Sequence, residues 1–169
     1  MDIVLEVASE HDAARILQIQ REAYVSEAER HSEPRIPPMV ESCEDIQTRI
    51  ARCVVLKAVA NGTIIGSVTG ALISTDTCLV TRLMVDPKYQ HQGLGRRLMG
   101  EIEFHFPAAG RFELYTGHLS DRNIALYQRL GYEEFKREAV SPTVDLVHMR
   151  KTRPSASPDS IVAPDLAEH

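Results

Sequence analysis

The chain has 169 residues, of which 43% are hydrophobic and 25% are charged, and its formal net charge at pH 7 is −5. These values fit one globular domain with a sizeable core. Because the sequence has no run of about 18 apolar residues and no basic secretory leader, we expect neither a membrane span nor a signal peptide. The acidic balance argues against nucleic-acid binding, and three cysteines without C-x-x-C spacing argue against a disulfide framework or a zinc site and for a cytoplasmic location.

The first fifty residues predict a strand followed by two helices. Residues 3–8 alternate apolar and polar side chains, as a half-buried strand does, and Ser9 is a favourable cap for the helix that follows. That helix is expected to run to about Ala28. Three prolines make residues 29–41 unsuitable for regular helix, and a second helix is expected after a cap at Ser42.

Three strands are expected next. Residues 53–59 are rich in β-branched and apolar side chains, and the dipeptide Asn61-Gly62 is a hairpin signal that returns the chain into a strand over residues 63–74. The third strand, over residues 78–85, leads directly into a loop that contains two glycines.

The glycine loop joins this strand to an amphipathic helix. Leu94, Leu98 and Ile102 are four residues apart, which is the spacing of one helical face. Gly93 and Gly95 stand where the backbone must bend and another group must come close. Because the N–H groups that open a helix have no partners within it, and the helix dipole adds positive potential there, the loop predicts a phosphate-binding site.

The loop matches neither of two common phosphate-binding patterns. No Gly-Lys-Ser/Thr closes it, as a Walker loop requires, and Leu98 stands where the dinucleotide fingerprint has its third glycine. The pattern present is Gln90-x-x-Gly93-x-Gly95, preceded by a strand that ends in V-D-P. It resembles the pyrophosphate-binding motif of the GNAT superfamily of N-acetyltransferases, whose ligand is acetyl-coenzyme A. An ordinary strand-to-helix connection is the alternative interpretation.

The remaining elements complete one domain over residues 1–151. A short helix is expected between a cap at Ser120 and a stop at Gly131. Residues 152–169 are rich in Ser, Pro, Ala and Asp and are expected to form a disordered C-terminal tail. Three more strands are expected, over residues 112–116, 133–137 and 143–151.

The predicted order is strand, two helices, three strands, helix, strand, helix and two strands. This order lacks the strict strand–helix alternation of a dinucleotide-binding fold. It matches the GNAT fold over about residues 2–151. The expected fold class is therefore α/β of the mixed α+β kind, with a central, mostly antiparallel sheet of six to seven strands flanked by about four helices.

The resemblance implies that main-chain groups bind acetyl-coenzyme A, with no metal. The strand before the loop would hydrogen-bond the pantetheine arm, and loop N–H groups would bind the pyrophosphate, a sensible arrangement because phosphate needs donors rather than particular side chains. The expected coenzyme-binding residues are Leu83, Met84, Val85, Gln90, His91, Gln92, Gly93, Leu94, Gly95, Arg96, Asn123 and Tyr127.

A second resemblance lies in residues 123–132, which read N-x-x-L-Y-x-x-L-G-Y and look like the family's second signature helix. It implies that Asn123 binds the pantetheine arm or an ordered water. It also implies that Tyr127 protonates the leaving thiolate, which a phenol of pKa about 10 is able to do. Many members place seven residues between this Asn and Tyr, whereas here they are four apart. A core tyrosine with a satisfied hydroxyl is the alternative for Tyr127.

The general base has no clear signature. Many relatives use a Glu on the strand before the glycine loop, but residues 79–85 contain no carboxylate. Glu113 and His118, on or just after the next strand, are the candidates, acting directly or through water. A hydrogen-bonded or surface role is the alternative for each, and so is a base-free route through water.

The resemblance places the acceptor pocket at the first helix and the loop after it. The expected substrate-binding residues there are Tyr24, Glu27 and Glu33. Carboxylates in this region favour a cationic amine, although a solvated helix face explains Glu27 equally well.

The leading hypothesis is an N-acetyltransferase that moves acetyl from acetyl-coenzyme A to a primary amine by direct attack in a ternary complex. The acceptor would be a small molecule or a peptide, with no nucleic-acid or membrane partner, and the protein would be a monomer or homodimer. The alternative is a non-catalytic acyl-coenzyme A sensor of the same fold, which the missing strand carboxylate keeps open. An ATP-dependent enzyme is a third possibility, weakened by the absence of a loop lysine.

Overall fold

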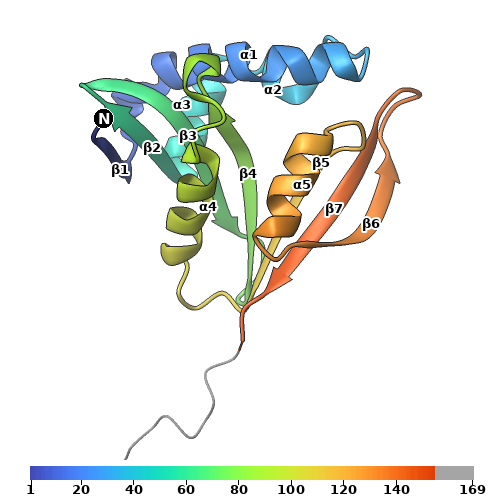
Figure 1. The fold of residues 1–169 in the computed structure, drawn as a ribbon. Coiled ribbons are helices and arrows are strands. Elements are labelled where there is room, and N and C mark those ends of the chain that lie inside the picture. The colour runs from blue at the N-terminus through green and yellow to red at the C-terminus, as the bar shows by residue number, and fades with distance from the viewer. Residues whose placement is uncertain (155–169) are drawn as a thin grey trace, which may run out of the picture.

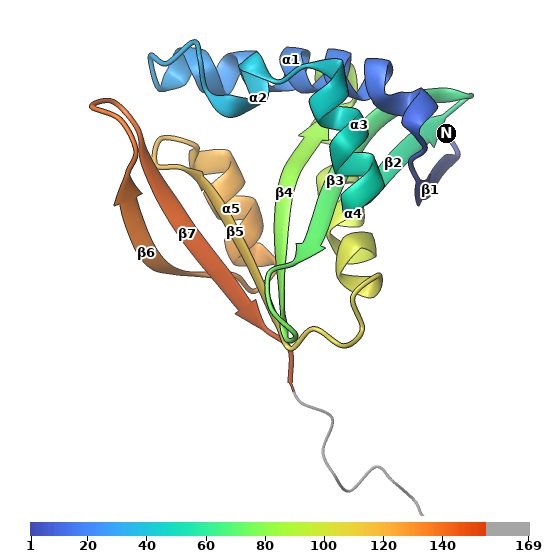
Figure 2. The ribbon, with the colours of Figure 1, turned by 180° about the vertical axis from the view of Figure 1, so that it is seen from behind.

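A computed structural model describes residues 1–154, which fold around one seven-stranded sheet with helices on both faces (Figure 1 and Figure 2). The strands are β1 (Ile3–Val7), β2 (Val54–Ala60), β3 (Thr63–Leu72), β4 (Thr77–Val85), β5 (Arg111–Gly117), β6 (Glu133–Ala139) and β7 (Asp145–Thr152). The α-helices are α1 (Ala13–Arg30), α2 (Pro37–Val40), α3 (Cys43–Arg52), α4 (Leu94–Phe104) and α5 (Asp121–Arg129). Within the described residues, no helix combines the length and the apolar character needed to cross a bilayer.

The sheet is split into two wings. Its strand order is β1-β2-β3-β4-β5-β7-β6, and β4 with β5 is its parallel pair. These two strands pair only where Thr77–Leu79 meets Arg111–Glu113. Beyond that point they diverge, so the sheet opens into a V with α1 lying across its open end (Figure 1 and Figure 2).

A β-bulge bends β4 within the open part of the V. Ser67 of β3 pairs with Met84 and Thr69 pairs with Thr81, so β4 has one residue more than β3 in this interval. Arg82 takes up the extra length with a φ of +54°. A bulge increases local twist and redirects side chains, and it helps β4 to turn away from β5.

Two hydrophobic clusters hold helices to opposite faces of the sheet. On one face, α4 buries Leu94, Leu98 and Ile102 against β2 and β3, as its four-residue spacing predicts. On the other face, α1 and α3 bury a separate cluster that includes Ile16 and Ile46. Because each face of β2 is covered, neighbouring residues of that strand are buried in different clusters.

The local signals of the sequence are confirmed where they can be checked in detail. The hydroxyl of Ser42 accepts a hydrogen bond from the N–H of Asp45 at 3.2 Å, and α3 begins there. Asn61 and Gly62 both have positive φ, +50° and +76°, as a tight hairpin requires. Gly131 has a φ of +96° and stops α5.

The expectation that residues 29–41 hold no regular helix is wrong in part. Pro37 and Pro38 begin the short helix α2, because a first-turn residue needs no helical N–H. The side-chain amide of Gln20 donates to the carbonyl of Pro38 at 2.9 Å and holds α2 against α1. The described chain thus has five α-helices where about four were expected.

The last strand ends one residue later than predicted. Strand β7 continues to Thr152, and the guanidinium of Arg153 donates to the carbonyls of Glu103 and Phe106 at 2.8 and 2.9 Å. The rest of the predicted tail, residues 155–169, lies outside the described residues.

Candidate active site

The loop between β4 and α4 presents backbone N–H groups that have no acceptor in the helix. His91 and Gly93 adopt the left-handed conformation, with φ of +64° and +82°. The first helical hydrogen bond of α4 runs from the N–H of Arg97 to the carbonyl of Gly93 at 3.2 Å. The N–H groups of residues 94–96 therefore have no helical acceptor, and the positive end of the helix dipole coincides with them. This arrangement is suited to an anion.

The loop forms one wall of a cavity of about 870 Å³ that also touches α1, β4 and α5; we call it the loop cavity. All the residues predicted to bind coenzyme line it, except Gln92 and Tyr127. Asn123 lines it from α5, so the two sequence motifs are brought to one cavity.

The loop cavity is rich in arginine. Its lining includes Arg30 of α1, Arg96 of α4, and Arg122 and Arg129 of α5. A guanidinium nitrogen of Arg122 lies 2.8 Å from Nε2 of His91, which links α5 to the loop. Arg96 was predicted from the motif, whereas the other three come from elements whose proximity depends on the tertiary fold. Guanidinium groups beside free N–H donors make the cavity suited to phosphate, although Arg30 is paired with Glu27.

Two carbonyl groups of β4 at the loop cavity already have partners. The hydroxyl of Tyr24 donates to the carbonyl of Leu83 at 3.2 Å, and the side-chain amide of Gln90 donates to that of Val85 at 3.0 Å. The side chain of Gln90 therefore stabilises the turn between β4 and α4. A ligand that lies along this part of β4 would therefore have to bind backbone groups other than these two carbonyls.

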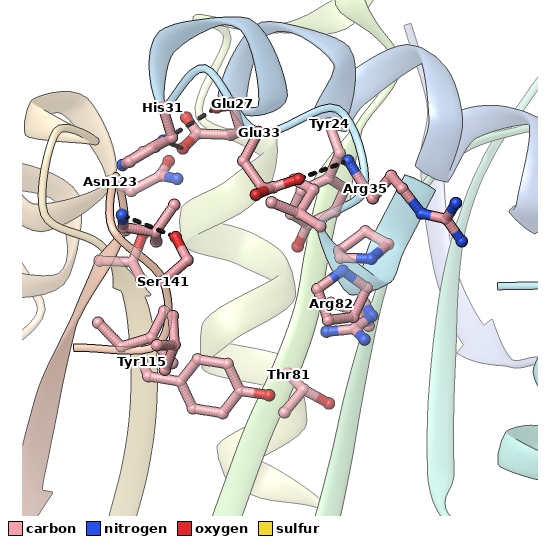
Figure 3. Close-up of a pocket in the computed structure, with 18 residues that line it drawn as sticks. Tyr24, Glu27, His31, Glu33, Arg35, Thr81, Arg82, Tyr115, Asn123 and Ser141 are labelled. Atoms are coloured by element: carbon pink, nitrogen blue, oxygen red, sulfur yellow. Dashed lines mark hydrogen bonds and ion pairs between the residues drawn. The ribbon is translucent and has the colours of Figure 1, made fainter. Parts of the chain in front are cut away.

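A second cavity, of about 500 Å³, opens between the end of α1, β4, β5 and the loop between β6 and β7 (Figure 3). We call it the acceptor cavity. Tyr24, Glu27 and Glu33, the predicted substrate-binding residues, all line it. Arg35 and Arg82 line it as well, so its charge is mixed where the sequence emphasised carboxylates.

The two cavities meet at three side chains. Tyr24, Glu27 and Asn123 line both of them. A molecule in the loop cavity and another in the acceptor cavity would therefore touch at this junction. The divergence of β4 from β5 produces the junction, because it removes the sheet hydrogen bonds that would otherwise fill the space.

Glu27 joins α1 to the beginning of α5. One of its carboxylate oxygens lies 2.5 Å from the guanidinium of Arg30, and the other accepts a hydrogen bond from the hydroxyl of Ser120. Its side chain is only 16% exposed. A carboxylate held in this way is fixed in position at the junction of the cavities.

Tyr127 is largely buried, with 7% of its surface exposed, and lines neither cavity. Burial raises the pKa of its hydroxyl far above the usual range, and the nearby Tyr24 and Glu27 raise it further. Burial also raises the pKa of Tyr24 to about 12. Within residues 1–154 the Tyr127 hydroxyl forms no hydrogen bond, and it is not among the fully enclosed polar atoms without a partner, so it keeps some access to solvent.

The two candidate bases lie outside both cavities. Glu113 is on the part of β5 that still pairs with β4, and its carboxylate is ion-paired with Arg111. His118 follows β5, and its Nδ1 accepts a hydrogen bond from the N–H of Asp145 at 3.0 Å. Its ring packs edge-on against His31, with 5.4 Å between ring centroids. Among the described residues, no group of three or more His, Cys, Asp or Glu side chains is arranged to hold a metal ion.

Comparison with known proteins identifies the fold and the family. The family model described as "Acetyltransferase (GNAT) family" matches residues 13–132. The chain is 28% identical over 122 residues to the UPF0157 protein YqkA of Bacillus subtilis strain 168, a match that covers 72% of this chain and 35% of that relative. The chain thus spans about a third of the length of this curated relative.

Solved structures of N-acetyltransferases have a similar fold. The PaiA N-acetyltransferase of Thermoplasma acidophilum, solved with coenzyme A, is 21% identical with a TM-score of 0.72, covering 90% of this chain and 99% of that one. The ribosomal-protein-S18-alanine N-acetyltransferase of Escherichia coli is 19% identical with a TM-score of 0.76, covering 94% and 98%. At these identities the likeness establishes the fold.

Proposed function

This chain belongs to the GNAT family of acetyltransferases, and on that premise we propose that it transfers an acetyl group from acetyl-coenzyme A to the primary amine of an acceptor while both are bound. The observation that carries this proposal is the junction of two cavities at Tyr24, Glu27 and Asn123. One cavity is suited to phosphates and the other holds mixed polar and apolar groups. Direct transfer requires such contact between two binding sites.

Acetyl-coenzyme A fits the loop cavity by its chemistry. The free N–H groups of residues 94–96 and the arginines of α1, α4 and α5 offer donors and positive charge for its phosphates. Coenzyme A is present in the solved Thermoplasma relative, which supports this assignment. Asn123, at the junction of the two cavities, would bind the pantetheine arm. When bound, the coenzyme supplies an activated acetyl thioester.

We assign Tyr127 the role of general acid. The amine nitrogen of the acceptor forms a bond to the thioester carbonyl carbon, the carbon–sulfur bond breaks, and Tyr127 donates its hydroxyl proton to the leaving sulfur. An acceptor ammonium loses one proton before attack and a second after it. One of these two protons restores Tyr127 and the other leaves to solvent, so the reaction releases one proton overall.

We assign to Glu27, with Tyr24 beside it, the binding of the acceptor amine. Glu27 is a carboxylate at the junction of both cavities, where it attracts an ammonium and accepts its proton. His118 and Glu113 remain candidates that act through water, because neither lines a cavity. Cys43, Cys53 and Cys78 are free thiols, which supports the proposal that the protein works in the cytoplasm.

Release of free thiol from acetyl-coenzyme A tests the proposal. The panel of acceptors should include amino acids, polyamines and peptides with free N-termini, with the acetylated product identified by mass spectrometry. We expect amine-dependent thiol release well above hydrolysis for one acceptor class. Tight coenzyme binding without release for any amine would contradict the enzyme and favour the acyl-coenzyme A sensor, which the absence of a carboxylate on β4 keeps as the second candidate.

A further inference from the structure

Arg82 stands in the acceptor cavity on the bulge of β4. Its backbone has a φ of +54°, in the left-handed region that favours glycine, yet the residue is a large charged one. The bulge directs its side chain to the wall of the cavity, beside Thr81 (Figure 3). An arginine at a strained position that faces a cavity is a candidate for ligand recognition.

The ion pairs around Arg82 leave one positive charge without a counter-charge. Glu41 is shared by two guanidinium groups, those of Arg82 and Arg49. Nε of Arg82 donates to this carboxylate at 2.8 Å, and its side chain is 15% exposed. Two cations on one carboxylate give a net charge of +1. Within residues 1–154, the third guanidinium nitrogen of Arg82, Nη1, forms no hydrogen bond.

An unpaired negative charge lines the same cavity. Glu33 forms no ion pair with any described residue, and its carboxylate accepts only the backbone N–H of Arg35 at 3.2 Å. Glu27, by contrast, has an ion-pair partner in Arg30. Figure 3 shows Arg82 across the cavity from Glu27 and Asn123, with Glu33 on the wall above it. No ion pair joins Glu33 to Arg82, so the Glu33 carboxylate and Nη1 of Arg82 are available to a ligand.

We propose that the acceptor is a small amino-carboxylate, whose carboxylate is bound by Arg82 while its amine faces Glu33 and the junction at Glu27. This inference rests on the proposed acetyl transfer and names the class of its acceptor. A simple amine or polyamine could pair with Glu33 but would leave the positive charge of Arg82 and Arg49 without a second counter-charge in a partly buried site. The remaining walls of the cavity are largely apolar and suit an aliphatic side chain; they include Ile36, Pro37, Val140, Val144 and Leu146.

The test compares matched acceptors that differ only in the anionic group. Each amino acid is assayed beside its carboxamide and its decarboxylated amine, with a short peptide of the same N-terminal residue as a fourth arm. Loss of a charge-assisted hydrogen bond predicts that kcat/KM for the carboxamide and the amine falls about 10- to 100-fold. Equal or better turnover of the amide, the amine or the peptide would overturn the proposal.

The variant Arg82→Gln tests the residue itself. It leaves Glu41 paired with Arg49, so no carboxylate is left without a partner. We expect KM for the acid to rise about 10- to 100-fold, KM for the carboxamide to stay within about threefold, and discrimination between them to disappear. Arg52→Gln, an exposed change at the end of α3, is the matched control. Unchanged discrimination in Arg82→Gln would contradict the inference.

A binding measurement separates this inference from the proposed function. Isothermal titration of the protein loaded with coenzyme A, using the same matched acceptors, requires no turnover. Carboxylate-dependent binding that Arg82→Gln abolishes supports the inference even if no acetyl transfer occurs, in which case the proposed function fails alone. Binding that does not depend on the carboxylate overturns the inference even if amines are acetylated.

Discussion

The backbone N–H of Leu119 donates a hydrogen bond to Nε2 of His31 at 3.1 Å, and this bond ties the turn before α5 to the end of α1. Nδ1 of the same ring contacts the carbonyl of Glu27 at 2.9 Å, so both ring nitrogens are used. The ring is 5% exposed. Since α5 bears Asn123 and Tyr127, His31 helps to fix the junction between the two cavities.

Gly117→Ala should disturb this contact. A Cβ at Gly117 would lie 2.3 Å from Nε2 of His31, so the ring or the turn must shift. We expect a loss of about 1–3 kcal/mol in the free energy of unfolding, as for overpacked cores, together with reduced thiol release. Chemical denaturation measures the first effect. Gly100→Ala, where a Cβ on α4 meets nothing within 4 Å, is the control and should be neutral or slightly stabilising. Equal stability of the two variants would contradict the role given to His31.

Much of the fold could be predicted because its signals are local. The cap at Ser42, the hairpin at Asn61-Gly62 and the stop at Gly131 each depend on a few neighbouring residues, and all three are present. The short helix α2 was missed because the three prolines were interpreted as excluding helix. Its stability depends on Gln20, whose contact with Pro38 is a tertiary one.

The candidate site was predictable to the extent that it lies in motifs. The glycine loop was predicted from its residue pattern and Asn123 from the resemblance of residues 123–132 to a family motif, whereas Arg30, Arg122 and Arg129 of the loop cavity were not predicted. Those arginines are brought together by α1 and α5, which are far apart in the sequence. The role proposed for Arg82 depends on a bulge in the pairing of β3 with β4. Gly66 and Gly70 suggest a bend or bulge in β3, but they do not indicate that Arg82 takes up the extra length.

Replacing Tyr127 by phenylalanine should separate catalysis from binding. If its hydroxyl protonates the leaving sulfur, Tyr127→Phe should lower kcat about 100-fold or more while affinity for coenzyme A changes little. Tyr132→Phe is the matched control, because its hydroxyl donates to Glu103 at 2.8 Å within the core. That control should lose about 1 kcal/mol of stability and keep its kcat. A Tyr127→Phe protein with full activity would remove this residue from the mechanism.

The pH dependence should reflect tyrosines that stay protonated in the folded protein. Burial raises the pKa of Tyr24 to about 12 and that of Tyr127 higher still. Thiol release should therefore rise as the acceptor amine deprotonates and show no fall near pH 10, where an ordinary phenol ionises. An activity profile that declines with an apparent pKa near 10 would contradict this.

The same shifts predict a loss of stability at high pH. Tyrosines of the unfolded chain ionise near pH 10, whereas buried Tyr24 and Tyr127 keep their protons. The unfolded state therefore binds fewer protons, and the free energy of unfolding should fall as pH rises above about 10. Absorbance at 295 nm should detect fewer tyrosinates in the folded protein than in guanidinium. Tyr127→Phe should make the loss of stability less steep, and an unchanged slope would argue against a buried phenol.

Substitution of Gly93 should weaken coenzyme binding through the shape of the loop. Its φ of +82° disfavours a side chain, although a Cβ there would meet nothing within 4 Å. Gly93→Ala is expected to cost about 1–2 kcal/mol in the bound loop geometry and to lower the affinity for coenzyme A about tenfold. Gly62→Ala is the matched control, with a φ of +76° and equally open space in a hairpin outside the loop cavity. It should lose similar stability and bind coenzyme A normally; if both variants bind normally, the loop does not need its left-handed turn.

The central claim is that the loop before α4 binds the diphosphate of acetyl-coenzyme A through its backbone N–H groups. Amide hydrogen exchange of residues 91–96, measured by NMR with and without coenzyme A, tests this most directly because it reports on those groups alone. We expect exchange to slow when coenzyme A is added and to remain unchanged with pantetheine, which lacks the diphosphate. Measurable binding of coenzyme A with no protection of these amides would contradict the account.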